Sequence, residues 1–272
     1  MNTDHPAERS IVTYAETDLV ATIERLAGRP LAELTRQQRD LFDQFHVGGP
    51  EAVERLLPGL QLTAGTTVLD VGAGFGGPAR QVAATTGAHV VGVDLTAAYV
   101  EAARALTDAA GLGDRVRFEC TDVAALAAPA FDAAYTMHVQ MNVADKLGFF
   151  TAIAGHLRPG ARFACFEVCR TGPGEPSLPL PWSLDGSDSF LVTADELRAT
   201  IEASGFEALE WVDETAWVRE WFERAGARVL GDGTQATLPA LLADGATRMV
   251  NFAGAIMGGV VAIYRGTFVR AG

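Results

Sequence analysis

The sequence is poor in cysteine, in clustered basic residues and in long hydrophobic segments. The three cysteines, Cys120, Cys165 and Cys169, are odd in number. "CFEVC" at 165–169 lies in an apolar run and lacks the partners of a zinc site, so we expect buried, reduced thiols there and a cytoplasmic protein. The formal net charge of −13 argues against a nucleic-acid or anionic-membrane surface, because both select clustered Lys and Arg. No run of eighteen apolar residues predicts a membrane-spanning helix, and the charged first twenty residues do not resemble a signal peptide.

What is present is a regular alternation of strand and helix patterns. Residues 1–64 have apolar residues at helical spacing around the break "FHVGGP" and predict a helical N-terminal cap or lid. Residues 65–272 predict an α/β fold, a doubly wound, mostly parallel seven-stranded Rossmann-like sheet with an antiparallel last strand. Two insertions are expected, a Pro-rich one around 171–192 and a helical one around 215–258. The expected strands are 67–71, 89–94, 115–120, 131–137, 162–168, 207–214 and 258–270.

The stretch "VLDVGAGFGG" at 68–77 places a glycine-rich turn between a strand and a helix. Gly72, Gly74 and Gly77 fit the G-x-G-x-x-G fingerprint of dinucleotide sites. Asp70 stands two residues before the first glycine, where its carboxylate would repel a pyrophosphate on the helix N-terminus. The acid better suits a ligand without phosphate and with a positive centre. S-adenosylmethionine (SAM), with its sulfonium and ammonium groups, is such a ligand, and Asp70 would favour it directly or through water.

Acidic residues also end the next two strands. Asp94 ends "HVVGVD", where a carboxylate can accept hydrogen bonds from both ribose hydroxyls of either SAM or a nicotinamide cofactor. Asp122 follows "RVRFEC" and is placed to accept from the exocyclic amine of adenine. Each acid alone could be a helix N-cap or a solvated loop residue. Three acids at one sheet edge favour SAM over a dinucleotide.

Longer stretches resemble a known family. The motifs "VLDVGAGFGG", "VGVDLT", "CTDV" and "LRPGARFACFEV" resemble those of class I SAM-dependent methyltransferases. "FDQFHVGGPEA", "MHVQMNVADK" and "LPLPWSLDGSDSFLVTADELR" extend the resemblance to a subgroup that includes sarcosine and dimethylglycine N-methyltransferases, over nearly the whole chain. The resemblance implies a SAM-binding catalytic domain at 65–272, with the 171–192 insertion on the acceptor side. "TDV" departs from the Gly-Asp-Ala of many relatives but keeps the acid, and 215–258 matches no familiar pattern.

The resemblance also implies the cofactor contacts. The glycines would pass under the methionine portion, the three acids would meet the ammonium, the ribose and the adenine, and an N-terminal segment would fold over the cofactor and exclude water. The implied cofactor-binding residues are Tyr14, His46, Gly48, Asp70, Gly72, Gly74, Asp94, Leu95, Asp122, Val123 and Met137. No metal ligands are implied.

His138, just after the fourth predicted strand, is the candidate catalytic residue. A histidine with an ordinary pKa near 6.5 suits proton removal from a hydroxyl or carbon acceptor, whereas an amine acceptor needs little acid–base help. The alternative is that His138 only positions the acceptor. Trp182 could line the acceptor pocket or pack under its loop, and Glu167 could face the same pocket. The aromatics of 217–222 could form a helix core face or a cage for a cationic amine.

The predicted function is methyl transfer from SAM to nitrogen, oxygen or carbon of a small molecule. Lys146 is the only lysine, and the Ala- and Gly-rich composition is typical of high-GC bacteria, in which such enzymes often serve specialised metabolism. One alternative is a SAM-binding relative that catalyses a non-methylating reaction, such as a cyclisation. A nicotinamide-dependent oxidoreductase is less favoured, because Asp70 and Asp122 argue against it and no Tyr-x-x-x-Lys pair follows the fourth strand. The expected partner is a small-molecule acceptor, with no nucleic acid or membrane; the acceptor's identity and the oligomeric state do not follow from the sequence.

Overall fold

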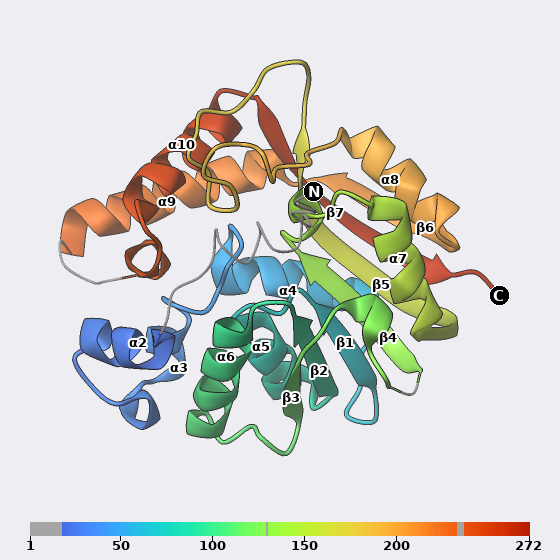
Figure 1. Cartoon of the computed structure of the whole chain (residues 1–272), viewed down its shortest axis with the longest axis horizontal. Helices are drawn as coiled ribbons and strands as arrows, with labels where there is room; N and C mark the ends of the chain where they lie inside the picture. Colours follow the sequence, from blue (N-terminus) through green and yellow to red (C-terminus); the bar gives the residue numbers. More distant parts are fainter. Residues whose placement is uncertain (1–17, 129, 233–236) are drawn as a thin grey trace, which may run out of the picture.

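The fold is built around one mixed, seven-stranded sheet. The computed structural model describes residues 18–128, 130–232 and 237–272, with side chains described outside 225–236. The strand order is β3-β2-β1-β4-β5-β7-β6 (Figure 1). The strands are β1 (Thr67–Val71), β2 (His89–Asp94), β3 (Val116–Cys120), β4 (Phe131–Met137), β5 (Leu157–Arg170), β6 (Phe206–Asp213) and β7 (Val261–Arg270).

The pairing of the strands confirms the predicted fold class. Strands β1 to β5 are mutually parallel, and β7 inserts antiparallel between β5 and β6. The longest difference from the sequence prediction is in β5, which begins at Leu157 rather than at 162. Leu157 pairs with Phe131 before a register shift in the β4–β5 ladder, so the strand is extended by one irregular segment.

Helices cover both faces of the sheet. They are α2 (Leu19–Ala27), α3 (Arg36–Arg39), α4 (Gly49–Leu60), α5 (Gly77–Thr86), α6 (Ala97–Ala109), α7 (Lys146–Gly155), α8 (Ala194–Ala203), α9 (Thr215–Asp232) and α10 (Gly245–Met257). Val68 packs with residues of α4, α5, α9 and α10, whereas its neighbour Leu69 packs with α7 and α8. Adjacent residues of one strand thus serve opposite core layers, as the two-residue period of a strand requires.

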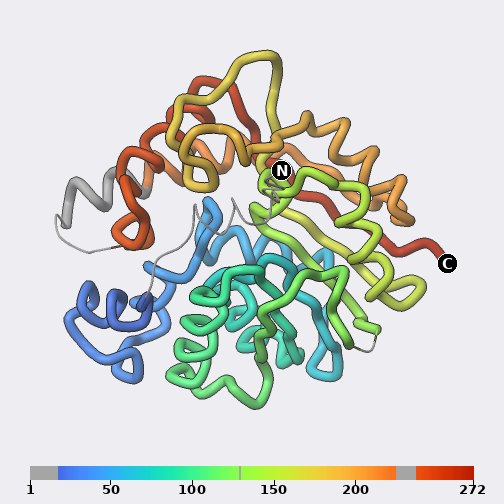
Figure 2. The backbone as a smooth tube through the Cα atoms, in the orientation of Figure 1, coloured from blue at the N-terminus to red at the C-terminus, as the bar shows by residue number. Residues whose placement is uncertain are grey.

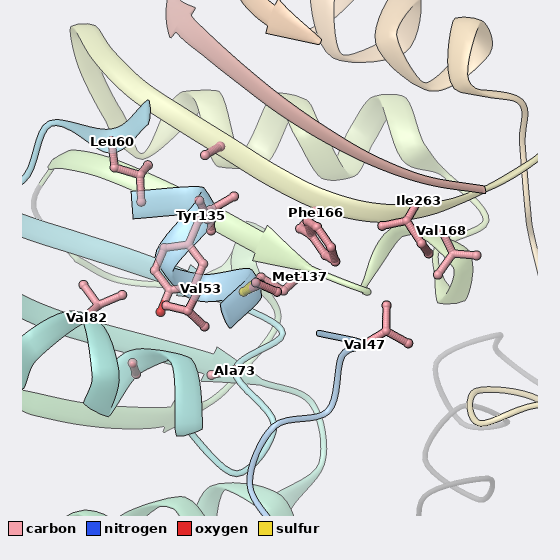
Figure 3. Close-up of a cluster of buried hydrophobic side chains, with 14 of the residues drawn as sticks. Val47, Val53, Leu60, Ala73, Val82, Tyr135, Met137, Phe166, Val168 and Ile263 are labelled. Atoms are coloured by element: carbon pink, nitrogen blue, oxygen red, sulfur yellow. The ribbon is translucent and has the colours of Figure 1, made fainter. Parts of the chain in front are cut away.

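The larger layer gathers side chains from every strand except β6 and from the helices above them. Figure 3 shows part of it, with Val53 and Leu60 of α4 near Tyr135 of β4, and Phe166 of β5 near Met137. All of these side chains are buried. Burial of such side chains contributes about 1.5–3 kcal/mol each, so this layer is a main source of stability.

The N-terminal segment and the α9–α10 segment meet on the same side of the molecule. A third cluster joins Leu19 and Ile23 of α2 to Tyr99 of α6 and Leu241 of η4 (Leu238–Leu241). Leu238 N donates to Leu41 O at 2.7 Å. Figure 2 shows both segments beside the carboxyl-end edge of the sheet, where the strand-end loops lie.

The expectation for the two cysteines of "CFEVC" is confirmed. Cys165 and Cys169 are buried in β5, Cys120 is exposed at the end of the edge strand β3, and all three are free. Within the described residues, no helix combines the length and the hydropathy needed to cross a membrane.

Candidate active site

A cavity of about 1610 Å³ opens at the carboxyl ends of the central strands. Its floor comes from the glycine turn, the ends of β2 and β4, and the loop after β3. Its roof comes from residues 40–51, Pro181 and Trp182, and parts of α9, η4 and α10. The volume exceeds the ~300–1,000 Å³ of most small-molecule sites, so it can hold two ligands side by side.

The glycine turn brings backbone N–H groups to the cavity wall. Gly72 has a φ of +76°, which favours glycine, and an added Cβ would collide with the Val139 side chain. Gly72 N donates to Val93 O at 2.9 Å, which ties the turn to β2. Gly72 and Gly74 both line the cavity, where the absence of side chains allows close approach by a ligand.

The third glycine of the fingerprint has a different role. A Cβ on Gly77 would collide with the backbone oxygen of Asp43, so this glycine lets the N-terminal segment pack against α5. Arg80 secures the same contact, because its Nη2 donates to Asp43 Oδ2 and to Phe75 O, each at 2.7 Å. The pair is almost completely buried. Here the last glycine of the G-x-G-x-x-G match serves packing within the protein.

Asp94 and Asp122 both reach the cavity. Asp94 Oδ2 accepts from Gly74 N and Oδ1 from Thr96 N, both at 2.9 Å. Burial raises the pKa of Asp94, and these backbone hydrogen bonds counteract that rise. Each carboxylate oxygen still has lone-pair capacity for a ligand hydroxyl. Asp122 is exposed and caps a short helix by accepting from Ala124 N at 2.8 Å, so the N-cap role and the cavity position coexist.

Two of the described residues predicted to bind the cofactor do not line this cavity. Asp70 is only 2% exposed and lies beside Tyr135, its register partner in β4, and burial raises its pKa to about 7. Gly48 caps α4 and packs against Trp217. Tyr14 lies outside the described residues. The other eight residues implied for the cofactor do line the cavity: His46, Gly72, Gly74, Asp94, Leu95, Asp122, Val123 and Met137.

Two buried histidines meet at the centre of the cavity. The ring centroids of His46 and His138 are 6.3 Å apart, and His138 stacks on Phe166 at 5.7 Å. Burial lowers the pKa of His46 to about 4 and that of His138 well below 6.5, so both are neutral at pH 7. His138 Nε2 has no hydrogen-bond partner among the described residues. It is therefore open to interaction with a ligand that enters the cavity.

Glu167 and Lys146 hold the loop that carries His138. Glu167 Oε2 accepts from Val139 N at 2.9 Å and from Gln140 N at 3.2 Å. Lys146 Nζ donates to the carbonyl oxygens of Gln140 and Val143, at 3.0 and 2.7 Å. The loop is tight, because His138 has a φ of +56°. Glu167 therefore lies behind the loop rather than in the cavity wall, contrary to one alternative from the sequence.

Aromatic side chains form the far end of the cavity. Trp182 lines it and also packs under its own loop, where Nε1 donates to Ser189 Oγ at 3.0 Å, so both sequence alternatives hold. Of the 217–222 aromatics, Trp221 and Phe222 line the cavity. Trp217 instead packs against Phe166 and under the guanidinium of Arg55, 4.3 Å from its ring.

Several wall residues were not predicted from the sequence. Tyr99 of α6 lines the cavity, with Phe45 5.3 Å and Phe75 4.7 Å away between ring centroids. Phe252 belongs to a segment without a recognised pattern. Gln44 and Phe45 lie in the stretch "FDQFHVGGPEA", whose resemblance to the family could have indicated their role. Among the described residues, no three His, Cys, Asp or Glu side chains gather as a metal site would require.

Comparison with known proteins identifies the family. Residues 68–160 match a family described as a methyltransferase domain. Methyltransferase GfsG of Streptomyces halstedii is 30% identical over 190 residues, which cover 65% of this chain and 66% of that protein. Methyltransferase phqN of Penicillium fellutanum is 30% identical over 158 residues, which cover 55% of this chain and 48% of that protein. The chain thus spans about half to two thirds of the length of these relatives.

Solved structures share the fold over most of the chain. The [4+2]-cyclase SpnF has a TM-score of 0.69 at 23% identity, covering 98% of this chain and 97% of its own. Geranyl diphosphate C-methyltransferase from Streptomyces coelicolor A3(2), crystallised with S-adenosyl-L-homocysteine, has a TM-score of 0.71 at 16% identity, covering 98% and 99%. A putative sarcosine dimethylglycine methyltransferase from Galdieria sulphuraria has a TM-score of 0.64 at 16% identity, and the match covers 82% of this chain and 85% of that one. At these identities the likeness concerns the fold.

The residues present suit the cofactor of this family. The glycine turn permits close backbone approach, Asp94 offers free lone pairs at the strand end, and the cavity has room for a second molecule. Sequence, fold and cavity therefore lead to one assignment: the chain belongs to the class I SAM-dependent methyltransferases.

Proposed function

We propose that the protein transfers the methyl group of SAM to a small molecule held in the same cavity. The observation that carries the proposal is the continuity of this cavity. It runs from Gly72 and Asp94 past Met137 and His138 to Trp182 and the α9–α10 segment. A cofactor at the glycine turn and an acceptor at the aromatic end would meet beside the two histidines.

The chain's own residues would mainly bind, align and exclude water. When bound, the cofactor supplies an electrophilic methyl group, whose departure leaves the bonding electron pair on sulfur. Asp94 would accept from the ribose hydroxyls, and the Asp122 region would meet the adenine. His46 and Phe45 from the N-terminal segment cover the junction and keep it dry. Alignment of reactants in this way can contribute on the order of 7–11 kcal/mol.

His138 would position the acceptor rather than act as a strong base. Burial of the ring lowers the pKa of His138 well below 6.5, so the ring is a weak base that takes up little proton at neutral pH. Its neutral ring can still exchange a hydrogen bond with the acceptor. This role agrees with the hydrogen bond that Glu167 accepts from the backbone of the next residue, Val139, and with the stacking of the His138 ring on Phe166.

A second function is supported by one comparison. The structural likeness to the [4+2]-cyclase SpnF extends over nearly the whole of both chains, so a SAM-binding protein with a non-methylating reaction is a real alternative. The two functions differ in their products. Methyl transfer forms one S-adenosylhomocysteine (SAH) per turnover, and a cyclisation forms none.

Binding and product formation together test the proposal. Calorimetry should show micromolar binding of SAM or SAH and far weaker binding of NAD, and SAH should accumulate with an acceptor mixture. Equal binding of NAD would refute the cofactor assignment. Acceptor conversion without SAH would support the cyclase-like alternative. A cytoplasmic location and a role in bacterial specialised metabolism stay predictions from the sequence.

A further inference from the structure

The cavity beyond the two histidines has a distinct chemical character. We call this part the acceptor chamber, and its walls include Trp182, Trp221, Phe222, Met249 and Phe252. Trp182 and Phe252 meet edge to face at 5.0 Å, which fixes one apolar corner. Such walls favour a ligand with a large hydrocarbon surface, because its burial releases about 25 cal/mol per Å².

The acidic side chains at the edge of the cavity are already engaged. Glu51 forms an ion pair with Arg224 at 2.9 Å. Asp145 accepts a hydrogen bond from Gly148 N at 2.9 Å and so caps α7. Asp40 lies 3.8 Å from Arg36. A cationic amine in the chamber would have to compete with these partners for each carboxylate.

Lys146 and Arg248, near the chamber, lie outside its wall. Lys146 donates to the carbonyl oxygens of Gln140, Val143 and Phe190. Arg248 is buried; its Nη1 donates to Pro181 O at 3.3 Å, and its Nε has no partner among the described residues. The described cavity wall itself holds neither lysine nor arginine. A phosphate or diphosphate group depends on such charge-assisted hydrogen bonds, so this wall is a poor host for it.

Two polar atoms at the chamber's inner end have hydrogen-bonding capacity to spare. His138 Nε2 is buried without a hydrogen-bond partner among the described residues, and the Gln44 amide, which also bonds Asp40, has a second N–H to donate; both residues line the cavity. An unsatisfied buried polar group costs about 1–3 kcal/mol, which a ligand can recover. A hydroxyl group suits both atoms, because its oxygen accepts from an amide N–H and its hydrogen donates to a neutral imidazole.

We propose that the acceptor is an uncharged, mainly hydrocarbon molecule that carries a hydroxyl group facing His138 and Gln44. This substrate class rests on the proposed function, since it assumes that the chamber holds the methyl acceptor. It sets this chain apart from geranyl diphosphate C-methyltransferase, whose fold it shares.

Three ligands with the same hydrocarbon test the proposal. Farnesol, farnesyl diphosphate and farnesylamine are titrated calorimetrically into protein saturated with SAH. We expect farnesol to bind at least tenfold more tightly than either charged analogue. Equal or tighter binding of a charged analogue, or no binding of farnesol, would overturn the substrate class. Failure of SAH itself to bind in the preceding titration would instead refute the proposed function, and the substrate class with it.

A variant with an added charge locates the binding. Val250 lies on α10, lines the cavity and is 70% exposed, so its replacement should not disturb folding. In Val250→Lys the ratio of farnesyl diphosphate affinity to farnesol affinity should rise at least tenfold above the wild-type ratio. Val250→Gln, the uncharged control, should keep the wild-type ratio. An unchanged ratio in Val250→Lys would show that these ligands bind outside the chamber and would overturn the assignment.

Discussion

At the scale of single residues, burial distinguishes three acids that look equivalent in the sequence. Asp94 faces the cavity with both oxygens oriented by backbone N–H groups, and Asp122 lies at its exposed rim. Asp70 of β1 is buried beside Tyr135 of β4, and burial raises its pKa to about 7. Asp94 is therefore the acid on which cofactor affinity should depend most.

Replacement of Asp94 by alanine should weaken SAM binding without unfolding the protein. The variant loses an ionised acceptor, and a hydrogen bond to a charged group contributes about 1.5–3 kcal/mol. The expected fall in affinity is roughly ten- to a hundredfold, measured by calorimetry. Asp94→Asn keeps one oxygen acceptor, so its SAM affinity should lie between those of the wild type and Asp94→Ala. Unchanged affinity in folded Asp94→Ala would place the ribose elsewhere.

Replacement of His138 by glutamine tests positioning against base catalysis. Glutamine keeps a hydrogen-bonding group but does not take up a proton near neutral pH. Positioning predicts a kcat close to the wild-type value, whereas loss of a general base lowers kcat by about 10²–10⁴. Because the pKa of His138 lies well below 6.5, protonation of this residue should lower the wild-type rate only in acid, with a flat profile above pH 6.5. A wild-type ionisation near 7 that disappears in the variant would contradict positioning.

At the scale of elements, a buried ion pair connects the roof of the cavity to its floor. Arg80 of α5 donates to Asp43 and to Phe75 O, so the segment that carries Gln44 and His46 is held against the glycine turn. Burial raises the pKa of Asp43 to about 6 despite the neighbouring guanidinium. Loss of the arginine would leave this carboxyl buried without its partner.

The variant Arg80→Ala should lower the free energy of unfolding by about 3–5 kcal/mol, as expected when one member of a buried pair is removed. Urea denaturation measures the change. The double variant Arg80→Met with Asp43→Leu removes both charges and should recover part of the loss. A double variant less stable than Arg80→Ala would contradict the account based on an unpaired carboxyl.

At the scale of the whole molecule, buried titratable groups make stability depend on pH in two directions. The pKa values of Asp70 and Glu167 are raised to about 7 by burial, so their contribution to stability is full in acid and is lost as pH rises through 7. The pKa values of His46 and His138 are lowered, so their contribution is lost as pH falls below 6.5.

Glu167→Gln isolates one of these effects. The amide oxygen can still accept from Val139 N and Gln140 N, but the side chain no longer ionises. Between pH 5 and pH 8 the wild type should lose on the order of 1–3 kcal/mol more stability than the variant. Urea denaturation at both pH values gives the comparison. An identical pH dependence in the two proteins would show that Glu167 keeps its ordinary pKa.

The sequence predicts the sheet better than it predicts the cavity. The parallel orientation of the strands follows from alternating strand and helix patterns, so the positions of Asp94, Asp122 and His138 at one edge could be foreseen, although the strand order was not predicted. The direction in which each strand side chain points could not be foreseen. Asp70 and Glu167 lie behind the cavity wall rather than in it. The chamber depends on contacts between distant segments, such as Leu238 N with Leu41 O, that no local pattern encodes.

The two ends of the cavity wall come from different parts of the chain, and this separation affects how the protein can evolve. The family match ends at residue 160, whereas Trp182, Trp221 and Phe252 of the acceptor chamber all come after it. Substitutions in the later segment can accumulate while the cofactor half stays intact. A lineage with this architecture can therefore change the apolar walls of the chamber through one region, whereas the contacts of Gln44 and His138 stay with the N-terminal part. Chimaeras joined after residue 160 should inherit their preference for the hydrocarbon part of the acceptor from the C-terminal parent.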